Sequence, residues 1–292
     1  AYAISSSKLR SDEVLAAAGI PVPEHYPKGR FPYIAKPSSM SGSEGVVRLN
    51  NPEELEVFLA NHSREKVVIE EFLEGPSYSI EVIGTPGNYN VYHITELFMD
   101  KDYDCKRVLS CPELPETLKK EFEDIAKKIG EIVKLHGIMD VEVIENKGVL
   151  KVLEIDARHP SQTPINIYHA TGANFMAEIH RIFCPHSDFP TAATEKASYV
   201  SLEQIMVDET AINILGEHII TKATGLHWVK NFCGADEAIT NYRPTSKSWV
   251  ATMICKAPTR RELAAKRENM FREIGKTMGC SLPVADYFPS DN

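Results

Sequence analysis

The sequence predicts a mixed α+β fold in which short strands alternate with amphipathic helices. Apolar residues recur at helical spacing over residues 115–135, whereas apolar and acidic residues alternate along residues 139–144 and 149–157. Strands and helices that alternate along one chain are typical of a domain whose helices cover a sheet. With 292 residues, the chain is long enough for a sizeable core and roughly two domains.

Composition excludes several classes of protein. A chain that is 43% hydrophobic and 25% charged has the balance of an ordinary soluble globular protein. The net charge of −9 disfavours nucleic acid as the main partner, because phosphate backbones attract clustered Lys and Arg. No apolar run approaches the roughly 18 residues of a membrane span. The six cysteines are scattered without a CxxC pair, which indicates reduced thiols and a cytoplasmic protein. The oligomeric state stays open.

The first predicted element is a helix that begins near Ser7, whose side chain is a suitable N-cap. Gly19 ends this helix, and the prolines at 21 and 23 prevent its continuation. Lys8 would lie in the first turn, where the helix dipole disfavours a cation unless an anion is close. The alternative interpretation is a plain surface lysine.

A lysine ends the next predicted strand. Residues 31–37 read as a short strand that contains Lys36, and a loop rich in Ser and Gly follows over residues 38–45. Such a loop can fold over phosphates while a neighbouring lysine adds positive charge. The loop lacks the spacing of a P-loop, so a flexible turn remains the alternative.

The remaining elements follow from the same patterns. Helices are expected at residues 52–59, 115–135, 168–183 and 259–278, with strands at 46–49, 67–73, 78–83, 89–97, 199–207 and 247–256. A charged loop is expected at residues 100–107, and the Pro-, Ser- and Thr-rich residues 185–197 indicate a connector.

Two strands joined by a short turn carry most of the candidate chemistry. Residues 139–144 and 149–157 flank a turn at 145–148 that contains Asn and Gly, which is a hairpin signal. Because side chains two apart share a face, Asp140 and Glu142 point to one side of the first strand. On the second strand Glu154, Asp156 and Arg158 line one face, and Leu153, Ile155 and Ala157 line the other. If the hairpin pairs, four carboxylates converge.

Carboxylates that converge on a sheet require a counter-charge, since burying unpaired charge is costly. Mg²⁺ takes oxygen ligands and keeps positions for phosphate, so it is a natural occupant. Arg158 stands at the end of the acidic strand, where a guanidinium can bind a phosphoryl oxygen in bidentate fashion. The alternative is a solvated acidic face that pairs with lysines.

The order of these signals resembles the ATP-grasp superfamily of carboxylate–amine ligases. Lys8 opens a helix that ends in Gly-Ile-Pro-Val-Pro, and Lys36 precedes a Ser/Gly loop. Residues 70–75 read Glu-Glu-Phe-Leu-Glu-Gly, and Glu142 precedes the Glu-Ile-Asp-Ala-Arg of residues 154–158. The resemblance covers about residues 1–184. It implies two α+β subdomains that sandwich ATP, followed by a small C-terminal β-rich extension.

Three stretches narrow the resemblance. Residues 103–105 (Tyr-Asp-Cys), 137–142 (Gly-Ile-Met-Asp-Val-Glu) and 154–164 are similar to the PylC family of 3-methylornithine–lysine ligases in pyrrolysine biosynthesis. This similarity implies an ADP-forming enzyme that joins 3-methyl-D-ornithine to the ε-amine of L-lysine through an acyl phosphate, with ATP and Mg²⁺ as cofactors. The implied domains are an ATP-grasp domain at 1–184 with a nucleotide-lid subdomain near 30–95, the connector at 185–197, and a C-terminal subdomain at 198–292.

The resemblance assigns ATP binding to three parts of the chain: the first turn of the N-terminal helix, the lysine strand with its loop, and the strand at 67–73. Glu70 would lie near the adenine amino group, and the backbone of Phe72 and Leu73 would form the hinge. The residues implied for ATP are Lys8, Lys36, Ser39, Ser41, Ser43, Glu70, Glu71, Phe72 and Leu73.

The resemblance also assigns the metal and the catalytic groups. Glu142, Glu154 and Asp156 would hold Mg²⁺ between the phosphates. Arg158 would stabilise the transferring phosphoryl group, with Lys36 as the second catalytic cation. The residues implied for the amino-acid substrates are Tyr103, Asp104, Asp140, Ser161, Gln162 and Thr163.

Two departures from the family pattern set limits on the prediction. Ser77 stands where many ATP-grasp enzymes place a ribose-binding Glu. The chain begins at Ala1 without the Rossmann-like domain that such ligases normally carry, so we expect that an N-terminal part is absent. Two alternatives therefore stand beside the ligase: another ATP-grasp amino-acid or peptide ligase, and a nucleotide-binding remnant without turnover.

Overall fold

The computed structural model of the chain describes residues 1–39, 42–62, 66–110, 113–185, 198–279 and 283–285. These residues form two compact units that alternate along the chain. The first unit holds residues 1–94, 113–160 and 175–185, and the second holds residues 95–110, 161–174 and 198–285. Each unit is described by itself below.

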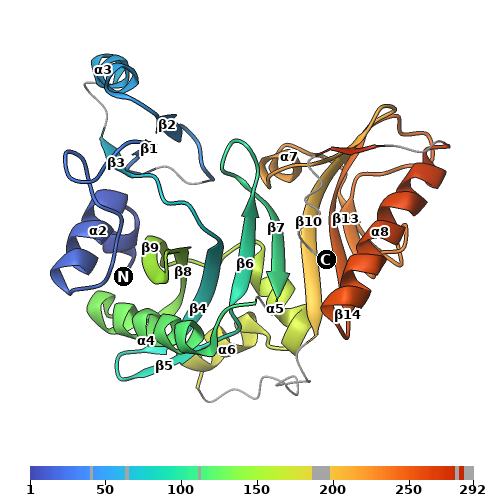
Figure 1. Cartoon of the computed structure of the whole chain (residues 1–292). Coiled ribbons are helices and arrows are strands. Elements are labelled where there is room, and N and C mark those ends of the chain that lie inside the picture. The colour runs from blue at the N-terminus through green and yellow to red at the C-terminus, as the bar shows by residue number, and fades with distance from the viewer. Residues whose placement is uncertain (40–41, 63–65, 111–112, 186–197, 280–282, 286–292) are drawn as a thin grey trace. The chain divides into compact units, whose positions relative to one another are not determined.

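Among its described residues, the first unit contains four strands of the larger sheet, a separate three-stranded antiparallel sheet and five helices (Figure 1). Its helices are α1 (Tyr2–Ser5), α2 (Lys8–Ala17), α3 (Pro52–Asn61), α4 (Glu116–Val133) and α6 (Phe175–Phe183). Its strands are β1 (Tyr33–Pro37), β2 (Val47–Leu49), β3 (Val67–Glu71), β4 (Ser77–Thr85), β5 (Asn88–Val91), β8 (Gly137–Asn146) and β9 (Val149–Asp156).

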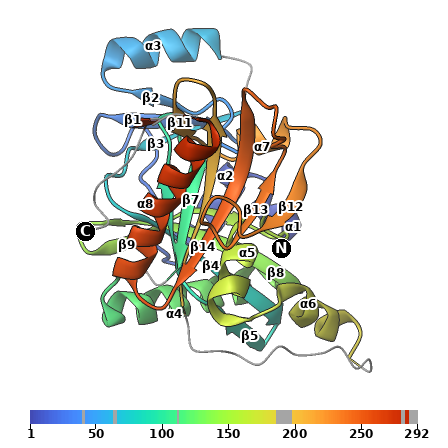
Figure 2. The ribbon, with the colours of Figure 1, turned by 90° about the vertical axis from the view of Figure 1, so that its right-hand side faces the viewer.

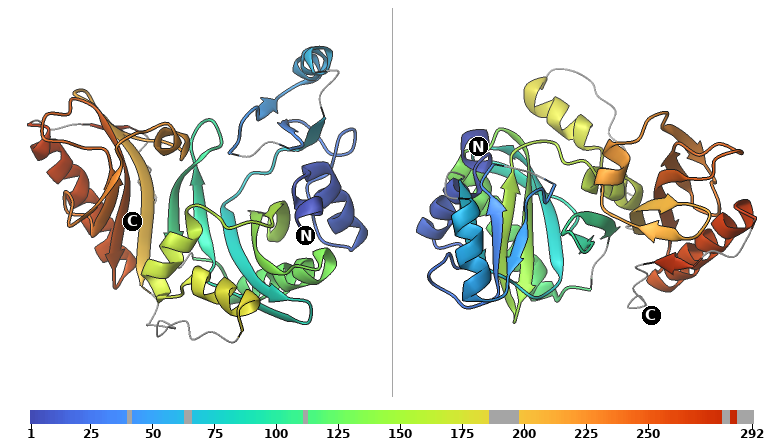
Figure 3. Two further views of the ribbon diagram at one scale, coloured as in Figure 1. Left: turned by 180° about the vertical axis from the view of Figure 1, so that it is seen from behind. Right: turned by 90° about the horizontal axis from the view of Figure 1, so that it is seen from above.

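One face of the larger sheet forms the core of the first unit. The four strands run in the order β5-β4-β8-β9, and every neighbouring pair is antiparallel. Helix α4 lies against β4 (Figures 1 and 3). Its apolar stripe, which includes Phe122 and Ile129, packs with Ile80, Met139 and Val141 of the strands, and all five side chains are fully buried. Because one face is used for the core, the other face is left for polar side chains.

The smaller sheet carries the predicted lysine strand and the predicted hinge strand. Its order is β2-β1-β3, and both pairs are antiparallel. In the register, Ile34 lies opposite Glu70, and Lys36 lies opposite Val68. Helix α3 supplies Leu55 and Phe58 to the small core beneath this sheet. The N-terminal helix α2 begins as predicted, because the Ser7 side chain accepts a hydrogen bond from the Arg10 backbone N–H.

The strands of the second unit run in the order β12-β13-β14-β10-β7-β6, and these neighbours are antiparallel. β11 pairs with β10 in antiparallel fashion, and β15 pairs with β11 in parallel. Helix α8 lies along β14 and β10 (Figure 2) and contributes Leu263, Met270 and Ile274 to the core of this unit. The strands are β6 (Thr95–Met99), β7 (Cys105–Ser110), β10 (Tyr199–Val207), β11 (Ile212–Ile214), β12 (His227–Lys230), β13 (Glu237–Thr240), β14 (Trp249–Ala257) and β15 (Val284–Ala285). The helices are α5 (Thr163–Thr171), α7 (His218–Thr221) and α8 (Arg260–Thr277).

The predicted elements agree with the structure, with three corrections. The helix predicted at 168–183 is two helices, α5 and α6, because Gly172 adopts φ +79° and its backbone N–H bonds back to Tyr168 O. The strand predicted at 89–97 is two strands, β5 and β6, separated by residues 92–94. The charged loop predicted at 100–107 ends earlier, since β7 begins at Cys105.

The predicted domain boundaries stay a prediction. Most of the connector predicted at 185–197 lies outside the described residues. Within the range predicted for the ATP-grasp domain, residues 95–110 and 161–174 belong to the second compact unit. Among the helices of the described residues, none is long and apolar enough to cross a membrane.

Candidate active site

Four carboxylates meet on the open face of the β8–β9 hairpin. In the antiparallel register Asp140 lies opposite Asp156, and Glu142 lies opposite Glu154. Residues directly opposite each other share a face of the sheet, so these two pairs form adjacent rows. Between them in sequence, Val141 points into the core and is fully buried. The hairpin and the convergence of its four acids are therefore confirmed.

A β-bulge interrupts the second strand of the hairpin. The pairing shifts between Glu142 and Val143, because Val143 lies opposite Val152 and Leu153 is left as the extra residue. The alternation of the two faces therefore breaks at Leu153. The sequence pattern predicts Leu153 on the core face beside Ile155, but in the structure Leu153 is only half-buried. Its carbonyl oxygen instead lies 3.5 Å from Lys36 Nζ. Bulges often re-aim one residue beside a functional site.

The neighbouring strand β4 adds two polar residues that the sequence reasoning missed. Ser79 lies opposite Glu142, and Glu81 lies opposite Asp140, so both share the acidic face. The Ser79 hydroxyl donates a hydrogen bond to Asp140 Oδ1, and both Ser79 and Glu81 are fully buried. Their two-residue spacing on the predicted strand 78–83 was the available signal. The acidic face therefore spans three strands.

Burial raises the pKa values of three of these acids. Burial raises the pKa of Asp140 to about 7. The hydrogen bond from Ser79 lowers this pKa, and the charge of Asp156 raises it further. Burial raises the pKa of Glu142 well above its usual range, and the charges of Asp140 and Glu154 add to this shift. The pKa of Asp156 is raised by its burial and, to a smaller extent, by the charge of Glu154. The charge of Arg158 lowers it and so partly offsets this rise. Desolvated like charges disfavour ionisation, so this face is short of positive charge.

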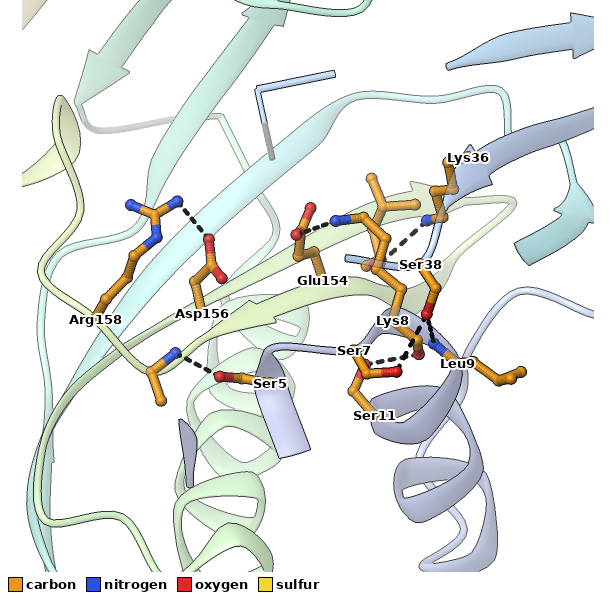
Figure 4. A network of polar contacts seen from close by, with 12 residues as sticks. Ser5, Ser7, Lys8, Leu9, Ser11, Lys36, Ser38, Glu154, Asp156 and Arg158 are labelled. Atoms are coloured by element: carbon orange, nitrogen blue, oxygen red, sulfur yellow. Dashed lines mark hydrogen bonds and ion pairs between the residues drawn. The ribbon is translucent and has the colours of Figure 1, made fainter. Parts of the chain in front are cut away.

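Two cations contact the acidic face (Figure 4). Lys8, the first residue of α2, forms an ion pair with Glu154. Arg158 Nη2 lies 2.6 Å from Asp156 Oδ2, with about half of the arginine side chain exposed. The position of Lys8 is fixed by its backbone N–H, which donates to Ser38 O at 2.8 Å. The helix dipole disfavours a lysine in the first turn of α2 unless an anion lies close to it. In the structure this anion is Glu154.

Lys36 lies in a second, more buried network. Its Nζ is 2.6 Å from Glu70 Oε1, and the side chains are 7% and 1% exposed. Burial lowers the pKa of Lys36, but the Glu70 charge and hydrogen bond outweigh it and leave that pKa raised. Beside Glu70, His25 Nε2 lies 2.9 Å from Asp12 Oδ2, and this hydrogen bond raises the pKa of His25. Asp12 and His25 were missed, since neither belongs to a periodic pattern.

The other residues predicted for ATP lie on β3 and on the loops at the ends of β1 and β3. Glu71 forms an ion pair with Lys151 of β9 and accepts a hydrogen bond from the Glu24 backbone N–H. Arg48 stacks over the Phe72 ring with 4.2 Å to its centroid. Leu73 is buried. Of the loop serines, Ser39 is exposed, Ser43 has φ +57°, and Ser41 lies outside the described residues.

The residues predicted for the amino-acid substrates divide between the units. Asp140 belongs to the first unit, whereas the other five belong to the second. There, Asp104 Oδ2 accepts from the His218 backbone N–H and lies 2.6 Å from His218 Nδ1. Ser161 and Gln162 both donate to Glu217 Oε2. Glu217 and His218 were missed, because no motif marks them. The remaining two are Tyr103, with φ +64°, and Thr163, whose side chain is buried.

The acidic face fits a hard divalent cation. Its donors are carboxylate oxygens on adjacent strands, which is the ligand type that Mg²⁺ prefers. Burial first, and the neighbouring acids after it, raise the pKa values of Asp140 and Glu142, and a bound cation would offset both effects. The residues that would hold the ion are the predicted set, Glu142, Glu154 and Asp156. This assignment stays a prediction.

Comparisons with known proteins identify the family. The family model of the ATP-grasp domain matches residues 5–162. The chain belongs to the ATP-grasp family. The match includes every acid and cation described above in the first unit, from Lys8 to Arg158. The order of signals that suggested an ATP-grasp fold is therefore confirmed.

One curated relative and two solved structures illustrate the similarity of this ATP-grasp chain to known proteins. The 3-methyl-D-ornithine–L-lysine ligase of Methanosarcina acetivorans is 35% identical over 222 residues, which cover 76% of this chain and 58% of that protein. The chain thus spans under three fifths of the length of this relative.

Both structures share the fold at low identity. An L-amino acid ligase from Bacillus licheniformis has a TM-score of 0.67 and 17% identity, and the alignment covers 92% of this chain and 71% of that one. The biotin carboxylase domain of Hydrogenobacter thermophilus 2-oxoglutarate carboxylase, crystallised with MgADP, has a TM-score of 0.69 and 15% identity, with coverages of 92% and 66%.

Proposed function

We propose that this ATP-grasp chain carries the activity of an ADP-forming carboxylate–amine ligase that joins 3-methyl-D-ornithine to the ε-amine of L-lysine. Its cofactors in this proposal are ATP and Mg²⁺, and its partners are small amino acids. The similarity to the Methanosarcina acetivorans ligase supports the choice of substrates. The product would serve pyrrolysine biosynthesis.

The observation that carries the proposal is the pairing of acids with phosphate-binding cations on one sheet face. Glu154 contacts Lys8, and Asp156 contacts Arg158. A face that needs cations, placed beside side chains that bind phosphate, suits a metal-bound nucleotide. An acidic face with a purely structural role would not require the exposed guanidinium of Arg158 beside Asp156.

The chemistry requires this combination of charges. A carboxylate is a poor electrophile at neutral pH, and phosphorylation gives it a good leaving group. When bound, Mg²⁺ neutralises charge on the phosphate oxygens. Lys8 and Lys36 would bind the phosphates, and Arg158 would stabilise the transferring phosphoryl group and the acyl phosphate. The Ser/Gly loop that follows Lys36 would exclude water from that reactive intermediate.

The attacking amine must be neutral, so a carboxylate has to position or deprotonate it. The sequence nominates Asp140 and Asp104 for this role. We assign it to Asp140, because Asp104 Oδ2 already accepts from the backbone N–H of His218 and contacts its ring. Asp140 accepts a single hydrogen bond in the described structure, from Ser79.

The proposal is tested by phosphate release from the 292-residue chain with Mg-ATP, L-lysine and D-ornithine, which stands in for its 3-methyl form. Mass spectrometry identifies the joined product. Glu154→Gln keeps the shape of the side chain and removes its charge, and we expect product formation to fall by about 100-fold or more. Glu116→Gln is the matched control, since Glu116 is 86% exposed and lies on α4, away from the acidic face.

A panel of other amino acids separates the rivals. Product from a different pair of substrates would favour another amino-acid ligase of the same fold. Nucleotide binding without ADP release for every pair would contradict the ligase proposal and favour a nucleotide-binding remnant.

A further inference from the structure

In the second unit, one carboxylate is held by hydrogen bonds on one of its oxygens only. Glu217 is half-buried, and its Oε2 accepts from Ser161 Oγ at 2.8 Å and from Gln162 Nε2. Among the described residues, no side chain or backbone group donates to Oε1. The carboxylate is therefore fixed in orientation while one oxygen stays available.

The backbone on both sides of Glu217 is anchored as well. The Gly216 N–H donates to Asp100 Oδ2 and the His218 N–H donates to Asp104 Oδ2, each at 3.0 Å. A Cβ on Gly216 would lie 2.2 Å from Asp104 Oδ2, so only glycine allows this close approach. Two buried aspartates thus hold the segment that presents Glu217.

A buried acceptor in the same network also lacks a donor. Gln204 on β10 is 2% exposed, and its Nε2 donates to Gln162 Oε1 at 3.2 Å. Its Oε1 is buried and accepts no hydrogen bond from the described residues. Buried acceptors in native proteins are nearly always satisfied. An unsatisfied acceptor on Gln204, which Gln162 links to the fixed carboxylate of Glu217, therefore points to a ligand that donates.

We propose that Glu217, linked to Gln204 through Gln162, binds an ammonium group of an amino-acid substrate. An ammonium brings three N–H donors, a positive charge and no acceptor. The described cluster offers the matching acceptors, Glu217 Oε1 and Gln204 Oε1. The donors of Ser161 and Gln162 are already used to hold the carboxylate. This inference rests on the proposed function, and all the residues that it names belong to the second unit.

The kinetic test compares Glu217→Gln with Glu209→Gln, which alters an exposed glutamate of the same unit. We expect Glu217→Gln to raise KM about tenfold or more for the amino acid whose ammonium is bound. KM for ATP and kcat should change less than about threefold, because the group acts on binding alone. Unchanged KM values for both amino acids, or a loss in kcat alone, would overturn the inference.

A binding test keeps this inference separable from the ligase reaction. L-lysine, D-ornithine, cadaverine and L-norleucine are titrated into the 292-residue chain by NMR. Cadaverine lacks the carboxylate, and norleucine lacks the side-chain amine. Binding of an amine that Glu217→Gln weakens about tenfold supports the site even when no product forms. Weaker binding of norleucine than of lysine would assign the site to the side-chain ammonium, and equal binding would assign it to the α-ammonium. No effect of Glu217→Gln on the binding of any of the four amines would refute the inference.

A second variant guards against a folding defect. Gln204→Met keeps the volume and removes the buried acceptor. We expect amine affinity to fall while the thermal unfolding temperature stays within about 3 °C of the wild type. A merely structural role predicts the opposite, a lower unfolding temperature with unchanged amine affinity.

Discussion

The buried pair of Lys36 and Glu70 allows the charge balance of the first unit to be tested quantitatively. The two groups lie 2.6 Å apart, and both side chains are nearly inaccessible. Removing one partner of such a pair leaves an uncompensated buried charge, which typically costs about 3–5 kcal/mol. We therefore expect Lys36→Met to lower the free energy of unfolding by about that amount.

The two single variants should not be equal. Glu70 faces Lys36 as its main cation, so Lys36→Met leaves the carboxylate desolvated and forces its protonation. Lys36 has further anions nearby, Glu154 and Asp12, so Glu70→Gln leaves it partly compensated. The amide of Gln also still accepts a hydrogen bond from the lysine. We expect Glu70→Gln to cost about 2–3 kcal/mol, in the range of a charge-assisted hydrogen bond.

Urea unfolding of the two single variants and of the double variant completes the cycle. Because Lys36→Met and Glu70→Gln together remove both charges, the double variant should be more stable than Lys36→Met alone. The coupling free energy should therefore exceed the cost of Glu70→Gln alone and reach about 3 kcal/mol or more. Additive effects, or a double variant less stable than either single one, would show that the pair is not the compensated unit described here.

Two further predictions concern the first unit. The hydrogen bond from Asp12 raises the pKa of His25 in the folded chain. The stability from this pair is therefore fully present below the unfolded pKa and is lost as pH rises through the folded one. Asp12→Asn should flatten the decline of unfolding free energy between about pH 6 and 8, measured by urea titrations; an unchanged slope would contradict it. Gly75→Ala should cost about 3 kcal/mol or more, because a Cβ there would lie 1.8 Å from Glu145 O, whereas Gly148→Ala, which meets nothing within 4 Å, should cost about 1 kcal/mol. Equal urea midpoints for the two glycine variants would argue against the close approach.

Local pattern was enough to predict most of the elements and the acidic hairpin. Alternation along β8 and β9 placed Asp140, Glu142, Glu154 and Asp156 on one face, since a strand has a fixed period of two. The same rule failed at Leu153, because a bulge adds one residue and the sequence carries no sign of it. Gly172 shows the opposite case. The sequence pattern placed Gly172 inside a helix, but in the structure α5 ends at this residue, because Gly172 adopts the left-handed conformation.

The partners of the site residues could not be predicted from local pattern. Glu70 meets Lys36, Asp12 and His25 through pairing and packing between distant segments. Ser161 and Gln162 were chosen from a resemblance, and the carboxylate they hold, Glu217, lies 55 residues beyond Gln162. Such contacts depend on tertiary structure, which no periodicity reports. Ser79 is intermediate, because its face follows from alternation but its neighbour on β8 does not.

The contacts of the acidic face suggest that cation and nucleotide replace existing ion pairs. Lys8 now neutralises Glu154, a predicted metal ligand, while it is itself a predicted phosphate ligand. Removing this lysine should therefore have opposite effects on the two ligands. Lys8→Met frees Glu154, so a divalent cation alone, measured with Mn²⁺, should bind more tightly, by about fivefold for one unit charge near the site at 1 kcal/mol. The same variant should bind nucleotide more weakly, because a phosphate contact is lost. Arg10→Met, which removes an exposed cation from the same helix, is the matched control. A parallel fall in both affinities would show that Lys8 supports the fold of the site instead of competing for it.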